Sequence, residues 1–463
     1  MPTAQLDPRD PESRIARLLD DGKFEFLLPR TDCGMVAVTG DIKGNKVIVF
    51  ASDATIKSGA LGVEGSKVIV SAYKAAMSAQ VPIIGIWHSG GARLSDGVAS
   101  LDAFGEVFQS MISASGRIPQ LSLVLGPTAG GGAYGPALTD IVVLSPEGRI
   151  FVTGPEVVKS VTGEDIDMAL LGGPEAHRKN SGLAHIIAPT EQEAIDDVRD
   201  LTALFANHGV MNPDVADIDL SVFVPESQVR TYEVHPLVDA ILDKETEHIE
   251  LLSMWAPNMT TIIGRLGGAT VGVLANNPAH IAGILDAAAG EKAARFVRTC
   301  DAFGIPLIVI ADVQGFLPGA GQEWEGAVRR GAKLLHAFGE AVVPRVTLIT
   351  RRAYGGAYVA MNSKALGATR VLAWPEAEVS VMGAVAAVRV LHRRILADLP
   401  AEQRESMELE LAAEHEKISG GVARAVEIGA VDEIIDPAHT RSALAKIIAS
   451  TPHRRGAHGN IPL

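Results

Sequence analysis

A register of 224 residues relates the two halves of this chain, and it limits the possible folds more than any other feature. The positions that match at this offset include Gly40 with Gly264, Val47 with Val271, Pro82 with Pro306, and Gly131-Gly132-Ala133-Tyr134 with Gly355-Gly356-Ala357-Tyr358. Self-similarity at one fixed spacing marks a repeated structural unit. We therefore predict two copies of one domain, in residues 1–225 and 226–463, joined by a turn-rich segment near residues 209–230.

Short apolar, β-branched runs alternate in each copy with longer stretches of helical period. In the first copy the runs are at 46–51, 81–87, 121–126 and 140–144, and the clearest helical stretch is 63–80. Runs that are apolar on both faces are typical of buried parallel strands connected through helices. The predicted fold class is α/β. Residues 390–427 are expected to form further helices, with their charged residues on solvated faces.

Charge and cysteine content exclude several functions. The chain has 41 Lys and Arg against 55 Asp and Glu, a net charge of −14, whereas nucleic-acid and anionic-membrane binders need clustered positive charge. Its two cysteines exclude a disulfide framework and a four-cysteine zinc site, and we predict no metal site. The polar N-terminus and the lack of long apolar runs predict a cytoplasmic protein that does not span a membrane.

Tandem small residues follow corresponding strands in the two copies, at 129–140 and 353–363. Glycine lets the backbone approach a ligand closely, and a strand that leads through glycines into a helix presents unpaired N–H groups. Two such donors aimed at one oxygen form an oxyanion hole. Close helix-to-strand packing is the alternative explanation, but recurrence in both copies favours a functional role. Neither stretch contains a nucleotide-binding motif.

A second pair of loops, at 85–97 and 310–323, also follows apolar strands. His88-Ser89 is a poor match to a serine hydrolase, because a nucleophile elbow requires G-x-S-x-G. Arg93 could hold a phosphate or carboxylate, or could pair with Asp96 or Asp102. The bases of the second half, among them Arg351 and Arg352, are expected on solvated helix faces, and binding of an anionic ligand or an acidic partner is the alternative.

Several strings resemble the carboxyltransferase (β) subunit of biotin-dependent acyl-CoA carboxylases, in particular the actinobacterial acetyl-/propionyl-CoA type. They are SGGARL at 89–94, AGGGAYGPA at 129–137, FVTGPEVV at 151–158, ANNP at 275–278, EKAARFVRTCDAFGIPL at 291–307, YGGAYVAMNS at 354–363 and the C-terminal HGNIPL. The resemblance covers essentially the whole chain. It implies two crotonase-like (ClpP/crotonase) domains, an N-terminal one in 1–225 and a C-terminal one in 226–463. One departure is Gln314, where the family often has proline.

The resemblance implies transfer of a carboxyl group from carboxybiotin to the α-carbon of an acyl-CoA, giving malonyl-CoA or methylmalonyl-CoA for fatty-acid synthesis. A thioester enolate and an enolate-like ureido oxygen on biotin then need two oxyanion holes. By resemblance, Gly131 and Gly132 hold the thioester oxygen, with Gly130 as a substitute donor, and Gly356 and Ala357 hold the ureido oxygen. No side-chain base is required if decarboxylated biotin takes the proton.

The remaining substrate-binding residues are expected around these two holes, and Val359 matches a position that influences acyl-chain selection in the family. The expected set is Gly130, Ala133, Tyr134, Gly355, Tyr358, Val359 and Arg93. The sequence ranks neither acetyl- against propionyl-CoA nor the residues that meet the phosphates of coenzyme A.

The resemblance also implies a hexamer, a trimer of dimers, with each active site between the first domain of one chain and the second domain of its neighbour. Biotin is expected on a separate subunit that carries the biotin carboxylase and biotin carrier, because this chain has no M-K-M attachment motif. Three other functions stay open at this point: a biotin-dependent acyl-CoA decarboxylase, another crotonase-fold CoA enzyme, and a non-catalytic scaffold.

Overall fold

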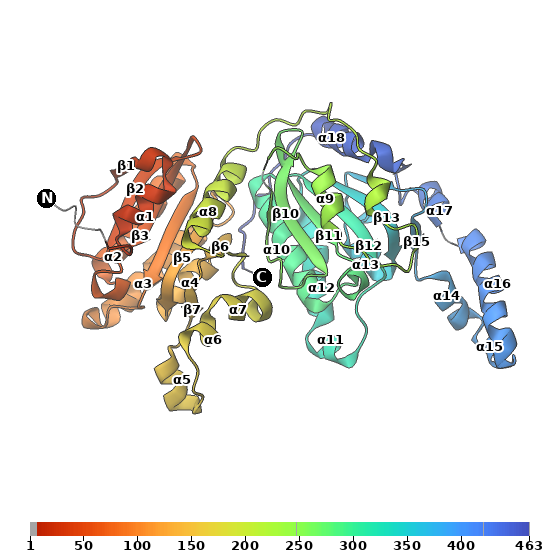
Figure 1. The fold of residues 1–463 in the computed structure, drawn as a ribbon, viewed down its shortest axis with the longest axis horizontal. Helices are drawn as coiled ribbons and strands as arrows, with labels where there is room; N and C mark the ends of the chain where they lie inside the picture. The colour runs from red at the N-terminus through yellow and green to blue at the C-terminus, as the bar shows by residue number, and fades with distance from the viewer. Residues whose placement is uncertain (1–6, 247, 420, 463) are drawn as a thin grey trace. The chain divides into compact units, whose positions relative to one another are not determined.

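Each copy of the repeat forms a sheet with a parallel core, as the apolar runs predict. The structure is a computed structural model that describes residues 7–246, 248–419 and 421–462, and these divide into two compact units. Figure 1 shows both sheets and the helices that cover them. The first unit comprises residues 7–208 with 249–255 and 457–462; the second comprises 209–246, 248 and 256–456, apart from residue 420.

The first sheet has the strand order β1-β2-β3-β4-β5-β6-β8, and β7 pairs with β5. Strands β3 to β6 run parallel to one another, whereas β2 and β3 form an antiparallel hairpin. The strands are β1 (Phe24–Phe26), β2 (Met35–Ile42), β3 (Asn45–Ser52), β4 (Ile83–Ser89), β5 (Gln120–Ala129), β6 (Ile141–Leu144), β7 (Arg149–Phe151) and β8 (Ile186–Ile187). The helices are α1 (Pro11–Leu18), α2 (Val63–Ala79), α3 (Val98–Ala114), α4 (Gly131–Ala137), α5 (Pro155–Thr162), α6 (Met168–Gly172), α7 (Pro174–Ala176) and α8 (Glu191–Ala206).

The second sheet repeats this plan, with the order β16-β14-β13-β12-β11-β10 and β15 paired with β13. Its strands are β10 (Met259–Leu266), β11 (Ala269–Asn276), β12 (Leu307–Val313), β13 (Arg345–Tyr354), β14 (Arg370–Ala373), β15 (Glu378–Ser380) and β16 (Glu433–Ile434); the short strand β9 is Ile249–Glu250. The helices are α9 (His235–Ile241), α10 (Ala287–Phe303), α11 (Ala320–Trp324), α12 (Ala327–Glu340), α13 (Gly355–Ala360), α14 (Ala384–Leu391), α15 (Arg393–Ala397), α16 (Ala401–Ser419), α17 (Gly421–Glu427) and α18 (Thr440–Ser450).

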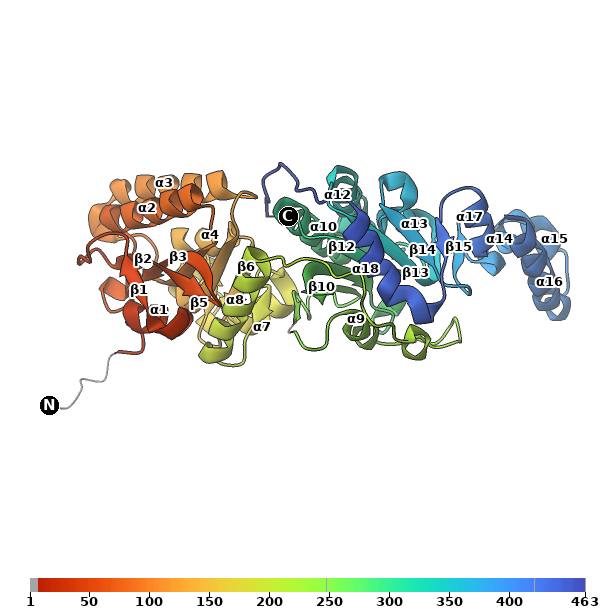
Figure 2. The same ribbon diagram turned by 90° about the horizontal axis from the view of Figure 1, so that it is seen from above.

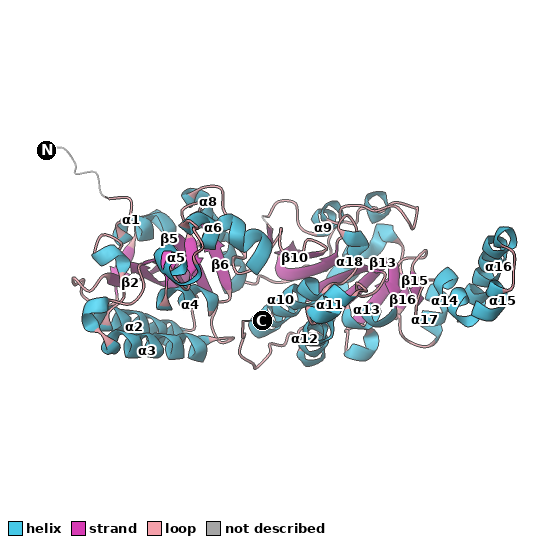
Figure 3. Ribbon diagram, turned by 90° about the horizontal axis from the view of Figure 1, so that it is seen from below, coloured by secondary structure: helices cyan, strands magenta, loops and turns pink. Residues whose placement is uncertain are grey.

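Helices cover both faces of each sheet, which explains why the parallel strands are apolar on both sides. In the first unit α2 and α3 lie on one face and α1 and α8 on the other (Figure 2). In the second unit α10 and α12 lie on one face and α9 and α18 on the other (Figure 3). The helices predicted within 390–427 are present as part of the α14–α17 set. The α/β fold built from a repeated unit is therefore confirmed.

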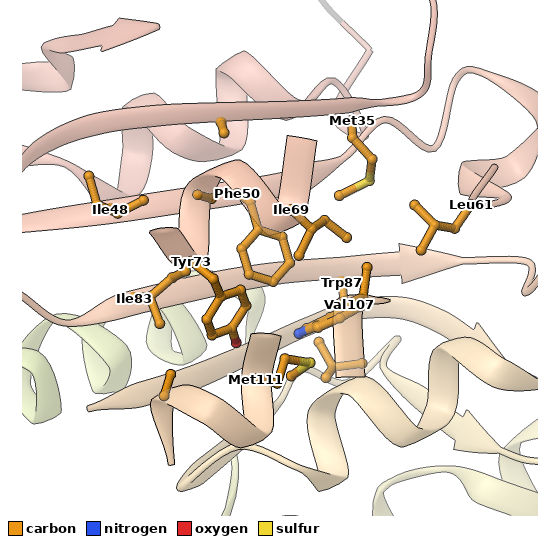
Figure 4. Packing of buried hydrophobic residues seen from close by; sticks show 14 of the residues in the cluster. Met35, Ile48, Phe50, Leu61, Ile69, Tyr73, Ile83, Trp87, Val107 and Met111 are labelled. Carbon is orange, nitrogen blue, oxygen red and sulfur yellow. The ribbon is translucent and has the colours of Figure 1, made fainter. Parts of the chain in front are cut away.

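The core of the first unit packs aromatic rings between the sheet and the helices α2 and α3 (Figure 4). Phe50 on β3 contacts Trp87 on β4 edge to face, with ring centroids 5.2 Å apart, and Tyr73 of α2 lies 6.0 Å from Phe50. The Trp87 indole N–H donates to Ser122 Oγ at 2.9 Å. Edge-to-face pairs add to the stabilisation that burial alone provides, and the indole keeps its polar atom satisfied inside the core.

The two units divide at residue 208, before the predicted boundary at 225. Local hydrogen bonding explains the difference, because Asn212 N–H donates to the Gly267 carbonyl at 2.8 Å in the β10–β11 turn. Leu220 is fully buried in the second unit's core, alongside Val234 and Leu237. The turn residues around 209–225 therefore belong to the second unit and are not a free linker.

The C-terminal segment 457–462 belongs to the first unit, where Asn460 is fully buried. The Asn460 side-chain amide donates to Asp140 Oδ1 at 2.7 Å, and its backbone N–H donates to Ser115 Oγ at 2.9 Å. The other oxygen of Asp140 accepts from the Gln120 N–H at 2.8 Å, where β5 begins. The HGNIPL motif thus contributes a structural anchor.

None of the described helices is long and apolar enough to cross a bilayer. Within the same described residues, no group of three His, Cys, Asp or Glu side chains could hold a metal ion.

We predict that Asn460→Ala destabilises the first unit, because the buried Asp140 carboxylate loses a donor. The expected loss is about 1–3 kcal/mol, measured as a lower urea midpoint by tryptophan fluorescence. Asn180→Ala, at an exposed position, is the matched control and should leave the midpoint unchanged. Equal midpoints for both variants would contradict an anchoring role.

Candidate active site

In the first unit, β5 leads directly into α4 through Gly130, which has φ +59°. That left-handed conformation favours glycine, because an L side chain is strained there. The Gly130 N–H donates to the Phe151 carbonyl at 3.1 Å. Gly130 is therefore not a free substitute donor, which corrects one part of the sequence-based expectation.

The next two backbone N–H groups, of Gly131 and Gly132, have no acceptor among the residues that the structure describes. They lie in the first turn of α4, where helical N–H groups lack an intrahelical partner. Gly131 is half-buried and Gly132 is buried. A Cβ on Gly132 would lie 3.3 Å from Ser89 Oγ at the end of β4, so little room is left there for a side chain. Two unpaired donors in succession are what an oxyanion hole requires.

The second unit builds the same turn between β13 and α13. Gly355 also has φ +59°, and a Cβ at this position would lie 3.1 Å from the Val381 carbonyl oxygen. The N–H groups of Gly356 and Ala357 have no acceptor in the described part of the chain. Gly356 is exposed, whereas Ala357 is fully buried.

The two turns correspond at an offset of 225, not 224. Strands β4 (Ile83–Ser89) and β12 (Leu307–Val313) keep the 224-residue spacing, but β5 (Gln120–Ala129) and β13 (Arg345–Tyr354) are 225 apart. Strand pairing fixes this shift, because Ile83 pairs with Gln120 and Leu307 pairs with Arg345. The second copy thus gains one residue between these strands. The sequence-based alignment of the two GGAY blocks is therefore wrong by one position.

The corrected register pairs Gly131 with Gly356 and Gly132 with Ala357, so the four predicted catalytic residues are structural equivalents. It also pairs Tyr134 with Val359, and both side chains are exposed, at 49% and 40%. Ala133 and Tyr358 point into their units: Ala133 is buried, and the Tyr358 hydroxyl donates to the Ala430 carbonyl at 3.3 Å. Burial raises the pKa of Tyr358, so its hydroxyl stays protonated at neutral pH.

Arg93 holds the backbone around the β4 loop. Its Nη2 donates to the Cys33 carbonyl at 2.7 Å and to the Ala60 carbonyl at 3.3 Å. The ion pairs with Asp96 or Asp102 that the sequence left open do not form. The half-buried guanidinium connects three segments of the first unit and so supports the loop that carries Ser89.

His88 and Ser89 do not form a catalytic dyad. As consecutive strand residues they point to opposite faces of the sheet, and Ser89 Oγ accepts from the Gly91 N–H at 3.2 Å. Burial, together with the charge of Arg14, lowers the pKa of His88 to about 4. The ring is therefore neutral at pH 7.

Arg351 and Arg352 lie on the buried strand β13, and not on a solvated helix face as predicted. Arg351 Nε donates to Asp312 at 2.7 Å, and Arg352 Nε donates to the same carboxylate at 3.3 Å. Arg351 also stacks over the Tyr232 ring at 4.7 Å. Lysine and arginine counts could not reveal this buried cluster, because composition does not distinguish paired from solvated charges.

A family model for the carboxyl transferase domain matches residues 10–458. The chain belongs to the carboxyl transferase family. It is 58% identical over 461 residues to the biotin-dependent acetyl-/propionyl-coenzyme A carboxylase beta6 subunit of Mycobacterium tuberculosis, covering 99% of this chain and 98% of that one. It is 51% identical over 466 residues to the propionyl-CoA carboxylase beta chain of Rhodococcus erythropolis, with 99% and 98% coverage.

Among solved structures, this carboxyl transferase is similar to the transcarboxylase 12S hexamer with methylmalonyl-coenzyme A and methylmalonic acid bound. The TM-score is 0.90 and the sequence identity 35%, covering 98% of this chain and 92% of that one. The similarity extends through both units, in agreement with the crotonase-like organisation that the resemblance implied.

We predict that Arg93→Met destabilises the first unit, because two backbone carbonyls lose a charged donor. The expected decrease in unfolding free energy is about 1–3 kcal/mol, measured by urea denaturation. An unchanged midpoint together with a raised KM for acyl-CoA would instead assign Arg93 to substrate binding.

Proposed function

We propose that this chain is the carboxyltransferase subunit of an acetyl-/propionyl-CoA carboxylase. It would transfer the carboxyl group from carboxybiotin, carried on a separate subunit, to the α-carbon of the acyl-CoA. The observation that carries this proposal is the equivalent pair of unpaired N–H donors in the two units. The names of the mycobacterial and rhodococcal relatives support the substrate class.

The reaction generates negative charge on two oxygens. Removing the α-proton of the acyl-CoA makes a thioester enolate, and releasing the carboxyl group from biotin places charge on the ureido oxygen. We assign the N–H groups of Gly131 and Gly132 to the thioester oxygen, and those of Gly356 and Ala357 to the ureido oxygen. Because the turns already hold these donors in place, little reorganisation is needed when the charge develops.

The other predicted site residues take supporting roles in this proposal. Gly130 and Gly355 set the turn through their positive φ, and Ala133 and Tyr358 pack behind the donors. Tyr134 and Val359 expose side chains one turn into the two helices and so face bound substrate. Arg93 acts on substrate indirectly, by holding the Cys33 and Ala60 backbone.

In this proposal the chain positions the two substrates and stabilises the negative charge that develops on their oxygens. No side chain acts as the base. Ser89 Oγ accepts from the Gly91 N–H, and the His88 ring lies 3.4 Å from Arg14 on the other face of the sheet. The proton from the α-carbon would pass to biotin itself as the carboxyl group leaves. Biotin thus acts as a substrate of this chain, delivered by the biotin carboxylase and carrier subunit.

Assembly, location and pathway belong to the same proposal. Transcarboxylase 12S is a hexamer, and we propose a hexamer for this chain as well. A cytoplasmic location and a role in fatty-acid synthesis would follow from acyl-CoA substrates and a malonyl-CoA product.

The direct test is incubation of the purified chain with its biotinylated partner subunit, bicarbonate, ATP and a series of acyl-CoAs. We expect malonyl-CoA from acetyl-CoA and methylmalonyl-CoA from propionyl-CoA. Release of CO₂ from malonyl-CoA without net carboxylation under any condition would favour a decarboxylase. No turnover in either direction would favour a non-catalytic scaffold.

We predict that Gly356→Val lowers kcat for carboxylation by about 100-fold or more, the loss typical of removing one oxyanion-hole donor. The Cβ itself fits, since its nearest neighbour is the Phe316 ring at 3.9 Å, but the branched methyl groups would cover the N–H pair. Gly105→Val, where a Cβ would have no neighbour within 4 Å, is the matched control. Normal turnover by Gly356→Val would remove this hole from the mechanism.

We predict that Val359→Ala raises kcat/KM for butyryl-CoA relative to acetyl-CoA, because removing two exposed methyl groups makes room for a longer acyl chain. One methylene in an apolar pocket changes selectivity by about 10- to 200-fold, and several-fold is expected at a half-exposed position. Competition assays with mixed acyl-CoAs measure the ratio. An unchanged ratio would show that Val359 does not contact the acyl group.

A further inference from the structure

A pocket of about 600 Å³ lies in the first unit, beside the carboxyl ends of β4 and β5. Its charged and polar lining residues are Arg9, Arg14, His88, Glu147, Arg149, Asp167 and Glu191, and Gly126 lies beside His88. Arg9 is already paired with Asp7 at 2.8 Å. Arg14 comes from α1 and Glu191 from α8, so the pocket opens on the face of the sheet opposite α2 and α3. Its volume suits a small molecule.

The Arg14 guanidinium lines this pocket, and not all of its hydrogen-bond donors have a partner. Its side chain is only 3% exposed, yet Nε has no hydrogen-bond partner among the described residues. Its remaining contacts are all long: 3.4 Å to His88 Nδ1, 3.4 Å to the Leu125 carbonyl and 3.6 Å to Glu191. A buried arginine normally has a close, paired anion.

Arg149 supplies a second guanidinium, and it is held rigidly. Its Nη1 donates to the Pro146 carbonyl at 2.6 Å and to the Gly148 carbonyl at 2.7 Å. Its Nη2 lies 3.9 Å from Glu147, whose side chain is 84% exposed, so this ion pair is weak. Both arginines are thus fixed in place while part of each guanidinium stays available.

Three carboxylates line the pocket: Glu147 is largely exposed, Asp167 has a close partner of its own, and Glu191 reaches Arg14 only at 3.6 Å. Asp167 accepts from the Leu170 N–H at 2.8 Å as the N-cap of α6. Glu191 pairs with Arg17 at 2.5 Å. Neither can move between Arg14 and Arg149 without losing its present partner.

At the equivalent place in the second unit, a buried arginine has a carboxylate partner. When the two sheets are aligned strand by strand, His88 is equivalent to Asp312 and Gly126 is equivalent to Arg351. In the second unit, the Asp312 carboxylate lies against Arg351 at 2.7 Å and is 1% exposed. In the first unit the His88 ring packs against Gly126 and occupies the space that the Arg351 side chain takes in the second. Where the second unit has a built-in carboxylate, the first has a neutral imidazole and a pocket.

We propose that this pocket binds a small carboxylate anion, held by the Arg14 and Arg149 guanidinium groups. The ligand's carboxylate takes the role that Asp312 has in the second unit. The His88 ring contributes a wall and carries no opposing charge. This binding is separate from the two oxyanion turns and does not depend on the proposed function.

Isothermal titration calorimetry of the full-length chain with succinate, at constant ionic strength, tests the proposal. Saturable binding is expected, and Arg14→Met and Arg149→Gln should each weaken it by about tenfold or more, the value of a hydrogen bond to a charged group. Arg178→Met, which removes a surface arginine paired with Glu175, should bind like the unaltered chain. Inorganic phosphate and neutral succinamide, titrated separately, distinguish a carboxylate site from a general anion site.

The double variant His88→Asp/Gly126→Arg places the Asp312–Arg351 pair of the second unit at the equivalent positions of the first. A Cβ on Gly126 would lie 2.3 Å from His88 Nδ1, so the two changes are needed together. This variant carries its own carboxylate and should lose succinate binding while keeping its circular dichroism spectrum and thermal midpoint. Absence of saturable binding in the unaltered chain, undiminished binding in all three pocket variants, or tighter binding of phosphate would each overturn the proposal.

Discussion

Both turns that join a strand directly to a helix at the candidate site depend on one backbone condition: the connecting residue takes a left-handed conformation, which favours glycine. Gly130 and Gly355 meet this condition with the same φ of +59°. Much of the structure supports these two turns: parallel strands bring β5 and β13 to the same relative place, and β7 and β15 each pair with the end of the strand that enters the turn. The donors that we propose for catalysis are therefore backbone atoms, fixed by strand pairing and independent of rotamers.

Repetition and periodicity in the sequence were enough to predict the α/β class, two related units and most central strands. The apolar runs at 46–51 and 81–87 correspond to β3 (Asn45–Ser52) and β4 (Ile83–Ser89). The one-residue shift at the turns could not be predicted, because GGAY matches GGAY letter for letter at the wrong offset. Only the pairing of Leu307 with Arg345 shows where the extra residue falls.

Long-range pairing also explains the other differences. Arg93 bonds to carbonyls 33 and 60 residues away along the chain, and Arg351 bonds to a carboxylate 39 residues away. No local pattern carries such information. A glycine-rich sequence, by contrast, reflects a local backbone requirement, so it indicated where the two turns lie, whereas the surroundings of the arginines could not be predicted.

The burial of Asn460 against Asp140 has a consequence for biosynthesis. A ribosome makes residues 457–462 only after the whole second unit, so the first unit emerges early but lacks its last buried hydrogen bonds until translation is nearly finished. Domains generally fold as units in the order of their synthesis, and here the earlier unit gains its last stabilising contacts only at the end of the chain. A chain truncated within the second half would therefore lack these contacts in its first unit.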